Sequence, residues 1–458
     1  MKRRTLFEDI YGRVGLVVYT KPSNCGGRCL YCFSQKGLPP SLFENEDTLR
    51  AKECGWNPAR QLEKLFNLYS LNRGSGNKCD IIVLGGSFTK YSRTYLLKYV
   101  KAIYNFLNGS ISRSIEEAKK LQEDAPDRCV TFCIETRPDI IDENWCKFLL
   151  KLGITKVEIG VQSLENSVLE VNQRDHTTET VIFATRILRD YGFKIGYHMM
   201  VGMVGSTWEL DVEALGRKLW QKDLCPDYLK IYPCVLLRGN YNQNRLSMQL
   251  NSGWKPLTDE TFNQLLMEIK PKVPPYVKIN RVQRIIPPEM IARGPSSIID
   301  RQRFSSICKC LWHRSVGQRG ADLNCDFSDY RIKTYKQGDG FYVEATFGID
   351  TILGYARVSF NRRESKAMIR ELRVFGKMLM VGERNPSFKG IQHIGIGKTL
   401  MGQIEELAVQ NKCVNLLVNA GVGVKRYFEA IRYKEEGNYL IKKLTLNDNI
   451  AVPRINNK

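Results

Sequence analysis

The sequence Cys25-Gly-Gly-Arg-Cys29-Leu-Tyr-Cys32 follows an apolar run, Gly15-Leu-Val-Val-Tyr-Thr20, which predicts a first β-strand. The C-x3-C-x2-C spacing places three thiolates in one short loop. Three thiolates are one ligand fewer than a closed tetrahedral metal site has, so something else must complete the shell. An iron–sulfur cluster with three cysteine ligands keeps one iron free for a substrate or cofactor, which indicates redox chemistry. On spacing alone, the alternative is half of a zinc site whose fourth ligand lies elsewhere.

Short apolar strands alternate with longer amphipathic stretches between residue 15 and about residue 235. The predicted strands span residues 15–20, 80–84, 129–134, 156–160, 195–200 and 228–232. The predicted helices between them span residues 58–69, 91–107, 143–152, 177–191 and 208–221. Crossovers of roughly 10–20 residues predict a parallel sheet, and six such units predict a partial (β/α)6 TIM-like barrel rather than a full eight-fold one. In this architecture, functional side chains gather at the C-terminal ends of the strands.

The remainder of the chain has a different pattern. Residues 240–300 are irregular and rich in proline, and Cys308-Lys-Cys310-Leu-Trp-His313 then forms a tight cluster of soft metal ligands. From about residue 340 the pattern is that of antiparallel strands, followed by a Gly-rich turn, a helix, a strand and another short helix. These elements are predicted at residues 342–347, 353–360 and 368–375 for the strands, 399–410 for the helix and 413–418 for the last strand. The fold class is therefore α/β, with a predicted tail at 1–14, a barrel domain at 15–300, a linker at 301–335 that carries the metal-ligand cluster, and an α+β domain at 336–458.

The composition is that of an ordinary globular protein, with 43% hydrophobic residues. The 458 residues are enough for two or three domains, and no run of 18 apolar residues predicts a membrane span. Lys2-Arg3-Arg4 is followed by Glu8 and Asp9 rather than by an apolar core, so it does not resemble a secretory signal. The fourteen cysteines then indicate reduced thiols and metal ligands rather than disulfides, and a cytoplasmic location.

The chain is strongly basic, with 69 Lys and Arg against 48 Asp and Glu and a net charge of +21. Such an excess favours a polyanionic partner. Between residues 270 and 320 only Glu289 and Asp300 are acidic, against eleven basic residues. These are Lys270, Lys272, Lys278, Arg281, Arg284, Arg293, Arg301, Arg303, Lys309, Arg314 and Arg319. The imbalance favours nucleic-acid binding over the alternative, a solvated and solubilising face.

Three motifs at successive strand ends resemble those of the radical S-adenosylmethionine (SAM) superfamily, over roughly residues 12–300. They are Gly85-Gly86-Ser87-Phe88, Ile134-Glu135-Thr136-Arg137-Pro138-Asp139 and Val157-Glu158-Ile159-Gly160-Val161-Gln162-Ser163. The resemblance implies a [4Fe–4S] cluster on Cys25, Cys29 and Cys32, whose free iron chelates SAM and whose electron cleaves SAM to a 5′-deoxyadenosyl radical. The implied SAM-binding residues are Gly85, Gly86, Ser87, Glu135, Gln162, His198 and Lys230. For His198 and Lys230, the residues alone leave a structural role in the core open.

The second domain resembles GNAT-type acetyltransferases. Gln392-His393-Ile394-Gly395-Ile396-Gly397-Lys398 matches their Q/R-x-x-G-x-G/A loop and leads into the predicted helix. Glycines let the backbone wrap the coenzyme A pyrophosphate, and the N-terminus of the helix offers unpaired N–H groups to it. The resemblance implies acetyl-CoA bound by these seven residues and by Tyr427, whose phenol would orient acetyl-CoA or protonate the leaving thiolate.

Together and in this order, the two domains resemble the family of the Elongator catalytic subunit and its stand-alone relatives, the tRNA uridine acetyltransferases. Collinear stretches such as Lys230-Ile-Tyr-Pro233, Ile279-Asn-Arg-Val-Gln-Arg284, Glu371-Leu-Arg-Val-Phe-Gly376 and Gly421-Val-Gly-Val424 extend the resemblance nearly end to end. It implies modification of the wobble uridine of tRNA at carbon 5. Acetyl-CoA supplies a two-carbon unit, the radical abstracts a hydrogen from the acetyl methyl, and the carbon radical adds to the base to give a carboxymethyl-type product. Tyr427 and Lys230 are the implied catalytic residues.

The same resemblance assigns the cysteine–histidine cluster and the basic segment. Cys308 and Cys310 match the zinc position of the family, where His313 replaces the expected third cysteine and Cys325 is a candidate fourth ligand. The alternative is a buried cysteine pair beside an exposed histidine. The basic segment would grip phosphates near the anticodon stem-loop. The predicted RNA-binding residues are Lys278, Arg281, Arg284, Arg301, Arg303 and Arg314.

Two positions depart from the family pattern. Phe33-Ser34-Gln35 stands where members usually have Pro-Gly-Gly, and Phe428 follows Tyr427 where members often have a second tyrosine. These departures keep a second hypothesis open, a catalytically degenerate tRNA-binding protein, and the GNAT-type domain keeps a third open, a protein lysine acetyltransferase. The expected partners are tRNA and acetyl-CoA, with either Elongator-type subunits or a second copy of the chain, and no membrane.

Overall fold

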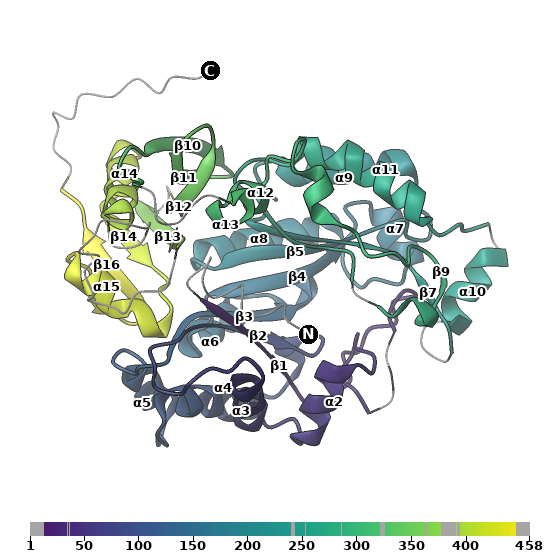
Figure 1. Ribbon diagram of the computed structural model, residues 1–458, viewed down its shortest axis with the longest axis horizontal. Coiled ribbons are helices and arrows are strands. Elements are labelled where there is room, and N and C mark those ends of the chain that lie inside the picture. The colour runs from purple at the N-terminus through teal and green to yellow at the C-terminus, as the bar shows by residue number, and fades with distance from the viewer. Residues whose placement is uncertain are drawn as a thin grey trace.

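The computed structural model (Figure 1) describes residues 13–33, 35, 37–239, 243–251, 253–284, 286–320, 326–361, 364–376, 391 and 394–445. Nine positions named in the sequence analysis lie outside the described residues: Lys2, Arg3, Arg4, Glu8, Asp9, Ser34, Cys325, Gln392 and His393. Two seven-stranded sheets form the framework, one in each half of the chain.

A curved parallel sheet forms the first domain. Its strands are β1 (Val14–Tyr19), β2 (Lys78–Leu84), β3 (Arg128–Thr136), β4 (Lys156–Gln162), β5 (Lys194–Val201), β6 (Tyr228–Pro233) and β8 (Lys278–Val282), and they neighbour one another in this order. All six predicted strands and the partial TIM-like barrel are confirmed. β8 is a seventh strand that pairs in parallel with β6. It lies in the proline-rich segment predicted to be irregular, and its sequence Lys-Ile-Asn-Arg-Val offers only two apolar residues as a strand signal.

Helices cover the outer side of this sheet (Figure 1). They are α2 (Glu46–Glu53), α3 (Pro58–Leu68), α4 (Arg93–Asn108), α5 (Ile115–Leu121), α6 (Glu143–Lys151), α7 (Asn166–Val171), α8 (Thr178–Asp190), α9 (Trp208–Gly216) and α11 (Asp259–Ile269). The side chain of Thr177 accepts a hydrogen bond from the N–H of Thr180, which caps α8. α9 ends earlier than predicted, and a short 3-10 turn at Lys218–Trp220 replaces its last turn. The inner side of the strands is left to line a cavity.

The second domain is built on a mostly antiparallel sheet in the order β10-β11-β12-β13-β14-β16-β15. The strands are β10 (Arg331–Gln337), β11 (Gly340–Phe347), β12 (Thr351–Asn361), β13 (Lys366–Val374), β14 (Asn415–Val418), β15 (Lys434–Glu436) and β16 (Tyr439–Lys443). β10 lies largely within the linker predicted at 301–335, so this sheet begins earlier than expected. α14 (Ile396–Gln410) packs on the sheet, and α15 (Lys425–Ala430) follows β14. β13 and β14 are parallel and pair only over Lys366–Ile369 of β13, so β13 continues beyond its partner.

Smaller elements connect the two sheets. A two-stranded sheet pairs β7 (Leu236–Leu237) with β9 (Ile291–Arg293), next to α10 (Gln243–Asn251). Two single-turn helices, α12 (Leu311–Arg314) and α13 (Val316–Arg319), lead to β10.

Buried charged side chains join the two domains. Asp227, which precedes β6, is completely buried and accepts hydrogen bonds from Arg370 of β13 and from the side chain of Gln337, the latter at 2.8 Å. Arg357 of β12 lies 3.6 Å from the same carboxylate and 3.1 Å from Glu371 of β13. These groups are buried together with a hydrophobic core that runs continuously through both domains, so the domains form one packed unit.

Candidate active site

The cysteine loop lies at the C-terminal end of β1 and opens into a cavity of about 720 Å³. Cys25, Cys29 and Cys32 all line this cavity, and every cysteine in the described part of the chain is free of disulfides. A Cβ on Gly27 would lie 3.1 Å from Nη1 of Arg137, so the loop is pressed against that guanidinium. Three free thiols facing one cavity fit the three protein ligands of an iron–sulfur cluster.

Arg174 is a contact of the cysteine loop that the sequence analysis missed. Its guanidinium donates one hydrogen bond to Sγ of Cys29 at 3.4 Å and a second to the carbonyl of Gly160 at 2.6 Å. Arg174 follows α7 in the segment Asn172-Gln-Arg-Asp, far from the cysteines in sequence, so only the fold brings them together. A donor of this kind stabilises thiolate charge on Cys29.

The paired glycines after β2 permit a tight turn at the edge of the cavity. Gly85 has φ +142°, and a Cβ there would lie 1.9 Å from Oγ1 of Thr20. Gly86 has φ +81° and packs against the ring of Pro40. Both glycines and Ser87 line the cavity, as predicted for backbone that approaches a cofactor.

Four side chains from different strands meet inside the barrel. Nζ of Lys230 lies 2.9 Å from Glu135 and 2.5 Å from Glu158, and Nε2 of His198 lies 2.8 Å from Glu158. Gly196 makes room for this cluster, because a Cβ there would lie 2.8 Å from Cγ of Glu158. The sequence analysis assigned Glu135, His198 and Lys230 to the site, whereas it quoted Glu158 only as part of a strand-end motif. In the structure Glu158 bonds to Lys230 and His198.

The charges of this cluster fix its protonation. Burial disfavours both carboxylates in their charged form, but Lys230 and His198 hold the pKa of Glu135 below its usual range. Lys156 and Lys230 likewise hold the pKa of Glu158 well below its usual range in spite of burial. Burial alone would lower the pKa of Lys230, and the two carboxylates instead raise it well above its usual range. Lys230 is therefore an ammonium at neutral pH.

Gln162 occupies an irregular position at the end of β4. Its φ is +70°, next to a register shift between β4 and β5, and it lines the cavity. A Cβ on Gly160 would lie 2.8 Å from Nε2 of Gln162. The glycine thus leaves room for the amide, which supports the predicted contact of Gln162 with a cofactor.

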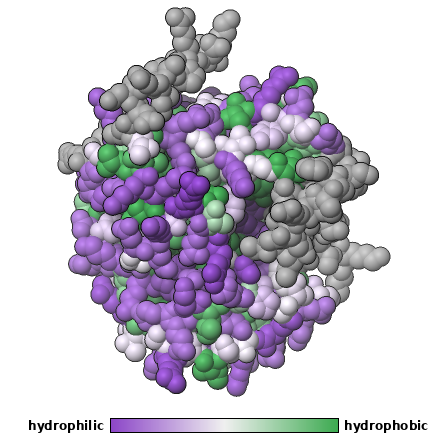
Figure 2. Space-filling model, turned by 90° about the vertical axis from the view of Figure 1, so that its left-hand side faces the viewer, coloured by the Kyte–Doolittle hydropathy of each residue, from purple (hydrophilic) through white to green (hydrophobic). Residues whose placement is uncertain are grey.

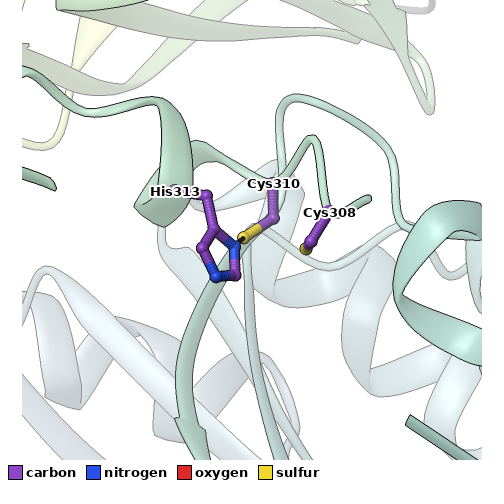
Figure 3. Close-up of side chains that lie close together, drawn as sticks. All are labelled: Cys308, Cys310 and His313. Carbon is purple, nitrogen blue, oxygen red and sulfur yellow. Dashed lines mark hydrogen bonds between the residues drawn. The ribbon is translucent and has the colours of Figure 1, made fainter. Parts of the chain in front are cut away.

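Cys308, Cys310 and His313 form a second candidate metal site (Figure 3). All three are buried, and their ligand atoms lie within 4.8 Å of one another, with 3.3 Å between Sγ of Cys310 and Nδ1 of His313. Nε2 of His313 donates to the carbonyl of Arg301 at 3.0 Å, which leaves the Nδ1 lone pair for a metal. Burial opposes a thiolate, but hydrogen bonds with Cys308 and His313 hold the pKa of Cys310 well below its usual range. The alternative of an exposed histidine is wrong, and the donor set fits zinc.

The predicted coenzyme loop leads into α14, which begins at Ile396 after Gly395 in a left-handed conformation. Ile394 is half-buried, and Lys398 is exposed on the first turn. A Cβ on Gly397 would lie 2.8 Å from the hydroxyl of Tyr427, which is buried and has no hydrogen-bond partner in the described structure. Burial raises the pKa of Tyr427 to about 12. An unpaired phenol at this helix terminus fits a cradle for a polar ligand.

Phe428, the second departure from the family pattern, is a packing residue. It is buried, and its ring meets those of Tyr427 and Tyr433 edge-on at 5.2 and 5.8 Å between centroids. The missing second phenol therefore leaves the position of the Tyr427 hydroxyl intact. The first departure affects Phe33, whose ring lies under the guanidinium of Arg284 at 4.6 Å.

The predicted RNA-binding residues fall into different environments. Arg281 and Arg303 are exposed, and Arg284 is half-buried. The guanidinium of Arg301 stacks on Trp312 at 3.8 Å and donates to two backbone carbonyls of β8. Arg314 contradicts its predicted role, because it is buried and bonded to both oxygens of Glu344 at 2.8 and 2.7 Å. A neutralised, buried arginine cannot grip phosphates.

Lys278, the sixth of these residues, faces the interior of the barrel and lines the cavity.

Figure 2 shows that the face of the molecule at the second-domain end is largely hydrophilic. No helix in the described ranges has both the length and the apolar character needed to cross a bilayer.

A three-cysteine loop that follows the first strand of a parallel half-barrel and lines its cavity is typical of radical SAM enzymes, and residues 19–215 match the model of the Radical SAM superfamily. Such an enzyme uses SAM and a [4Fe–4S] cluster. The tRNA uridine(34) acetyltransferase of Dehalococcoides mccartyi is 33% identical over 469 residues, which cover 96% of this chain and 100% of the relative. The chain belongs to the tRNA uridine(34) acetyltransferase family.

Two further comparisons agree with this assignment. Elongator complex protein 3 of Homo sapiens is 27% identical and covers 94% of this chain and 84% of its own length. The solved structure of the archaeal Methanocaldococcus infernus Elp3 with an N-terminal deletion matches with a TM-score of 0.77 and 27% identity, over 95% of this chain and 100% of that one.

Proposed function

We propose that this enzyme modifies the wobble uridine of tRNA at carbon 5, using a two-carbon unit from acetyl-CoA and radical SAM chemistry to give a carboxymethyl-type product. One observation carries the proposal: a single cavity is lined by the three cysteine thiols and also by Glu371 and Arg373 of β13 in the second domain. A radical centre and an acyl-coenzyme domain are thus built into one packed unit. We place the enzyme in the cytoplasm.

In this proposal Cys25, Cys29 and Cys32 hold the cluster, and Arg174 stabilises the thiolate of Cys29. The backbone at Gly85 and Gly86 approaches the cofactor. The bound cluster and SAM supply the radical chemistry. Ser87, Glu135, Gln162 and His198 line the cavity and orient the polar groups of SAM.

Lys230 would act as a fixed cation and hydrogen-bond donor rather than as a base. It is held between Glu135 and Glu158, which keep it protonated. An ammonium in this position can orient a carbonyl oxygen of the uracil ring or of the acyl group. The sequence analysis predicted only that Lys230 is catalytic; the proposed role is that of a charged hydrogen-bond donor.

Acetyl-CoA would bind at the start of α14, where residues 394–398 form the described part of the predicted loop. The buried phenol of Tyr427 stays protonated at neutral pH because burial raises its pKa. It can therefore donate a proton to the coenzyme A thiolate as the thioester is hydrolysed. Cys308, Cys310 and His313 would hold a structural zinc ion between the two domains.

tRNA is the proposed partner, and the exposed Arg281 and Arg303 lie on the basic segment that would contact its phosphates. Arg284 lies near the cysteine loop, where it donates to the carbonyl of Ser41 at 2.7 Å. Arg281 and Arg284 also line the cavity that the three cysteine thiols line, which supports an approach of tRNA from this side.

The test is an anaerobic incubation of the full chain, with reconstituted cluster and zinc, reductant, SAM, acetyl-CoA and tRNA. Mass spectrometry of the nucleosides is expected to show a carboxymethyl-type uridine together with 5′-deoxyadenosine. Tyr427→Phe should lower tRNA-dependent release of coenzyme A. Tyr433→Phe is the matched control, because that phenol bonds to Glu405 instead. tRNA binding without either product would favour the degenerate tRNA-binding protein, and peptide acetylation without tRNA would favour a lysine acetyltransferase.

A further inference from the structure

The cysteine loop and the segment after β8 meet at the edge of the cavity, next to the third cysteine. Phe33 follows Cys32 directly, and Sγ of Cys32 lies 3.4 Å from Oγ of the exposed Ser41. Arg284, two residues beyond the end of β8, donates a hydrogen bond from its guanidinium to the carbonyl of Ser41 at 2.7 Å. These four residues all line the cavity, so the contact forms part of its wall.

Aromatic rings support the guanidinium of Arg284. Its central carbon lies 4.6 Å from the ring centroid of Phe33 and 5.5 Å from that of Phe43. The two rings meet edge-on, with 5.8 Å between their centroids and an angle of 61° between their planes. Phe43 is buried in a small hydrophobic cluster with Leu237 and Ile286, against which Phe33 also packs. Because a planar guanidinium binds well over an aromatic face, these side chains form a layered surface on a packed base.

Most of the hydrogen-bonding capacity of Arg284 is unused. Among the described residues its guanidinium forms one hydrogen bond, to Ser41, and no ion pair, although a guanidinium carries five N–H donors. By contrast Arg137, which lines the same cavity, pairs with Asp139 and Asp175, each at 2.8 Å. Arg284 is only half-buried, and none of its nitrogen atoms is enclosed without a partner. Its remaining donors are therefore accessible to a ligand in the cavity.

The same surface lies close to the polar cluster around Lys230. Burial lowers the pKa of Arg284 from its usual value, and the negative charge of Glu135 opposes this change. Glu135 is also the carboxylate that lies 2.9 Å from Nζ of Lys230. A flat ligand resting on Phe33 and Arg284 would therefore share a compartment with the ammonium of Lys230, which lines the same cavity.

We propose that Phe33 and Arg284 form a platform on which a nucleobase of the bound RNA stacks as it enters the barrel. Bases stack on aromatic rings and on arginine guanidinium planes, and the free N–H groups of Arg284 can donate to a carbonyl oxygen of the base. This inference rests on the proposed function, which takes tRNA as the partner, and it names the residues that hold the base. Phe33 stands where members of the family usually have proline, so the aromatic half of the platform is particular to this chain.

A phosphate is the other RNA group that an arginine without an ion pair can bind. The rings beneath Arg284 favour a base, because they hold its guanidinium as one layer of a stack. Arg281, three residues earlier in the chain, also lines the cavity but is exposed and lies over no ring in the described residues. Arg281 therefore suits a phosphate, and Arg284 suits a base.

The experiment measures the binding of anticodon stem-loop RNA to the full chain with its reconstituted cluster, by fluorescence anisotropy without acetyl-CoA or reductant. One hairpin is intact, and in each of the others a single loop nucleotide lacks its base. Stacking of one base corresponds to an affinity gain of about five- to 150-fold, so loss of the wobble base should weaken binding to the wild type by about tenfold.

Two variants test the platform, compared at equal iron content. Arg284→Lys keeps the charge and removes the plane, and Phe33→Leu keeps an apolar side chain and removes the ring. Each should reduce the ratio of intact to base-free affinity at least threefold. Arg281→Lys is the matched control, and its ratio should equal that of the wild type. Because each ratio is taken within one variant, a general loss of RNA affinity cancels, and Arg284→Lys leaves the cysteine loop itself unchanged.

The outcomes separate this proposal from the proposed function. A ratio that appears at another loop position and falls in Arg284→Lys would support the platform but refute the wobble position. Equal binding of every hairpin by the wild type, or an unchanged ratio in both variants, would overturn the platform. An equal loss for all hairpins in Arg284→Lys would overturn it in favour of a phosphate contact. SAM is titrated separately without RNA, and weaker SAM binding in both variants with an unchanged hairpin ratio would assign the surface to the adenine of SAM instead.

Discussion

Asp227→Asn is the sharpest test of the buried connection between the two domains. Asp227 is fully buried. Its carboxylate accepts hydrogen bonds from Arg370, from the side chain of Gln337 at 2.8 Å and from the backbone N–H of Ile195 at 2.9 Å. Asparagine keeps one acceptor oxygen but removes the charge that compensates Arg370 and Arg357. Breaking a buried ion pair from one side costs about 3–5 kcal/mol. Because asparagine preserves part of the hydrogen bonding, we expect about 3 kcal/mol, which is roughly a hundredfold change in the folding equilibrium.

The measurement is urea unfolding followed separately by circular dichroism and by tryptophan fluorescence. Asp339→Asn is the matched control, because Asp339 pairs with Lys222 at 2.8 Å with both side chains largely exposed. That change should cost less than about 1 kcal/mol. A loss below about 1 kcal/mol for Asp227→Asn would refute the reasoning that this carboxylate holds two buried arginines.

The stability lost in Asp227→Asn should also depend on pH. Burial would raise the pKa of Asp227, but Arg370 and Arg357 hold it below its usual range. A lowered folded-state pKa stabilises the protein above the unfolded-state pKa of about 4, and this stabilisation is lost as the pH falls through the folded-state value. The stability difference between the wild type and Asp227→Asn should therefore be full at pH 7 and shrink below about pH 4.

Three further changes test the site. Arg174→Gln should lower the reduction potential of the reconstituted cluster without loss of iron, because it removes the donor to Cys29; an electron paramagnetic resonance titration with unchanged potential would contradict this role. Gly196→Ala should displace Glu158 and lower the free energy of unfolding by about 1–3 kcal/mol, as measured by urea unfolding. Gly402→Ala is the control, because Gly402 of α14 has open space around it, and this change should be neutral or stabilising. Cys310→Ser should reduce the zinc content measured by mass spectrometry, with Cys413→Ser as a buried cysteine control outside the cluster, and equal zinc in both variants would argue against the site.

Local patterns predicted much of the fold. The six strands of the barrel follow from apolar runs between turn signals, and the antiparallel strands of the second domain follow from their alternation. β8 escaped prediction because its inward side chains, Lys278 and Asn280, are polar, which hides the usual signal of a buried strand. A strand whose inward side chains are polar cannot be recognised from an apolar run in the sequence.

The candidate site was predictable where chemistry and spacing coincide in the sequence, as in the cysteine loop and the coenzyme loop. Glu158 and Arg174 were not assigned to the site, because their roles depend on neighbours contributed by other strands and helices. Arg314 was assigned to RNA for the opposite reason: its charge is visible in the sequence, but its partner Glu344 lies on β11 of the next domain. Net charge alone does not distinguish a surface arginine from a buried one.

The segment Gly421-Val-Gly-Val424 shows how closely the halves of the chain depend on each other. A Cβ on Gly421 would lie 2.2 Å from the carbonyl of Val130, and one on Gly423 would lie 2.6 Å from Cβ of Arg128, so the second domain rests directly on the backbone of β3. Any side chain at either glycine would push the acyl-coenzyme domain away from the barrel. The two halves can therefore change only in concert, and replacing either one with the corresponding domain of a relative should succeed only if this glycine contact is carried across with it.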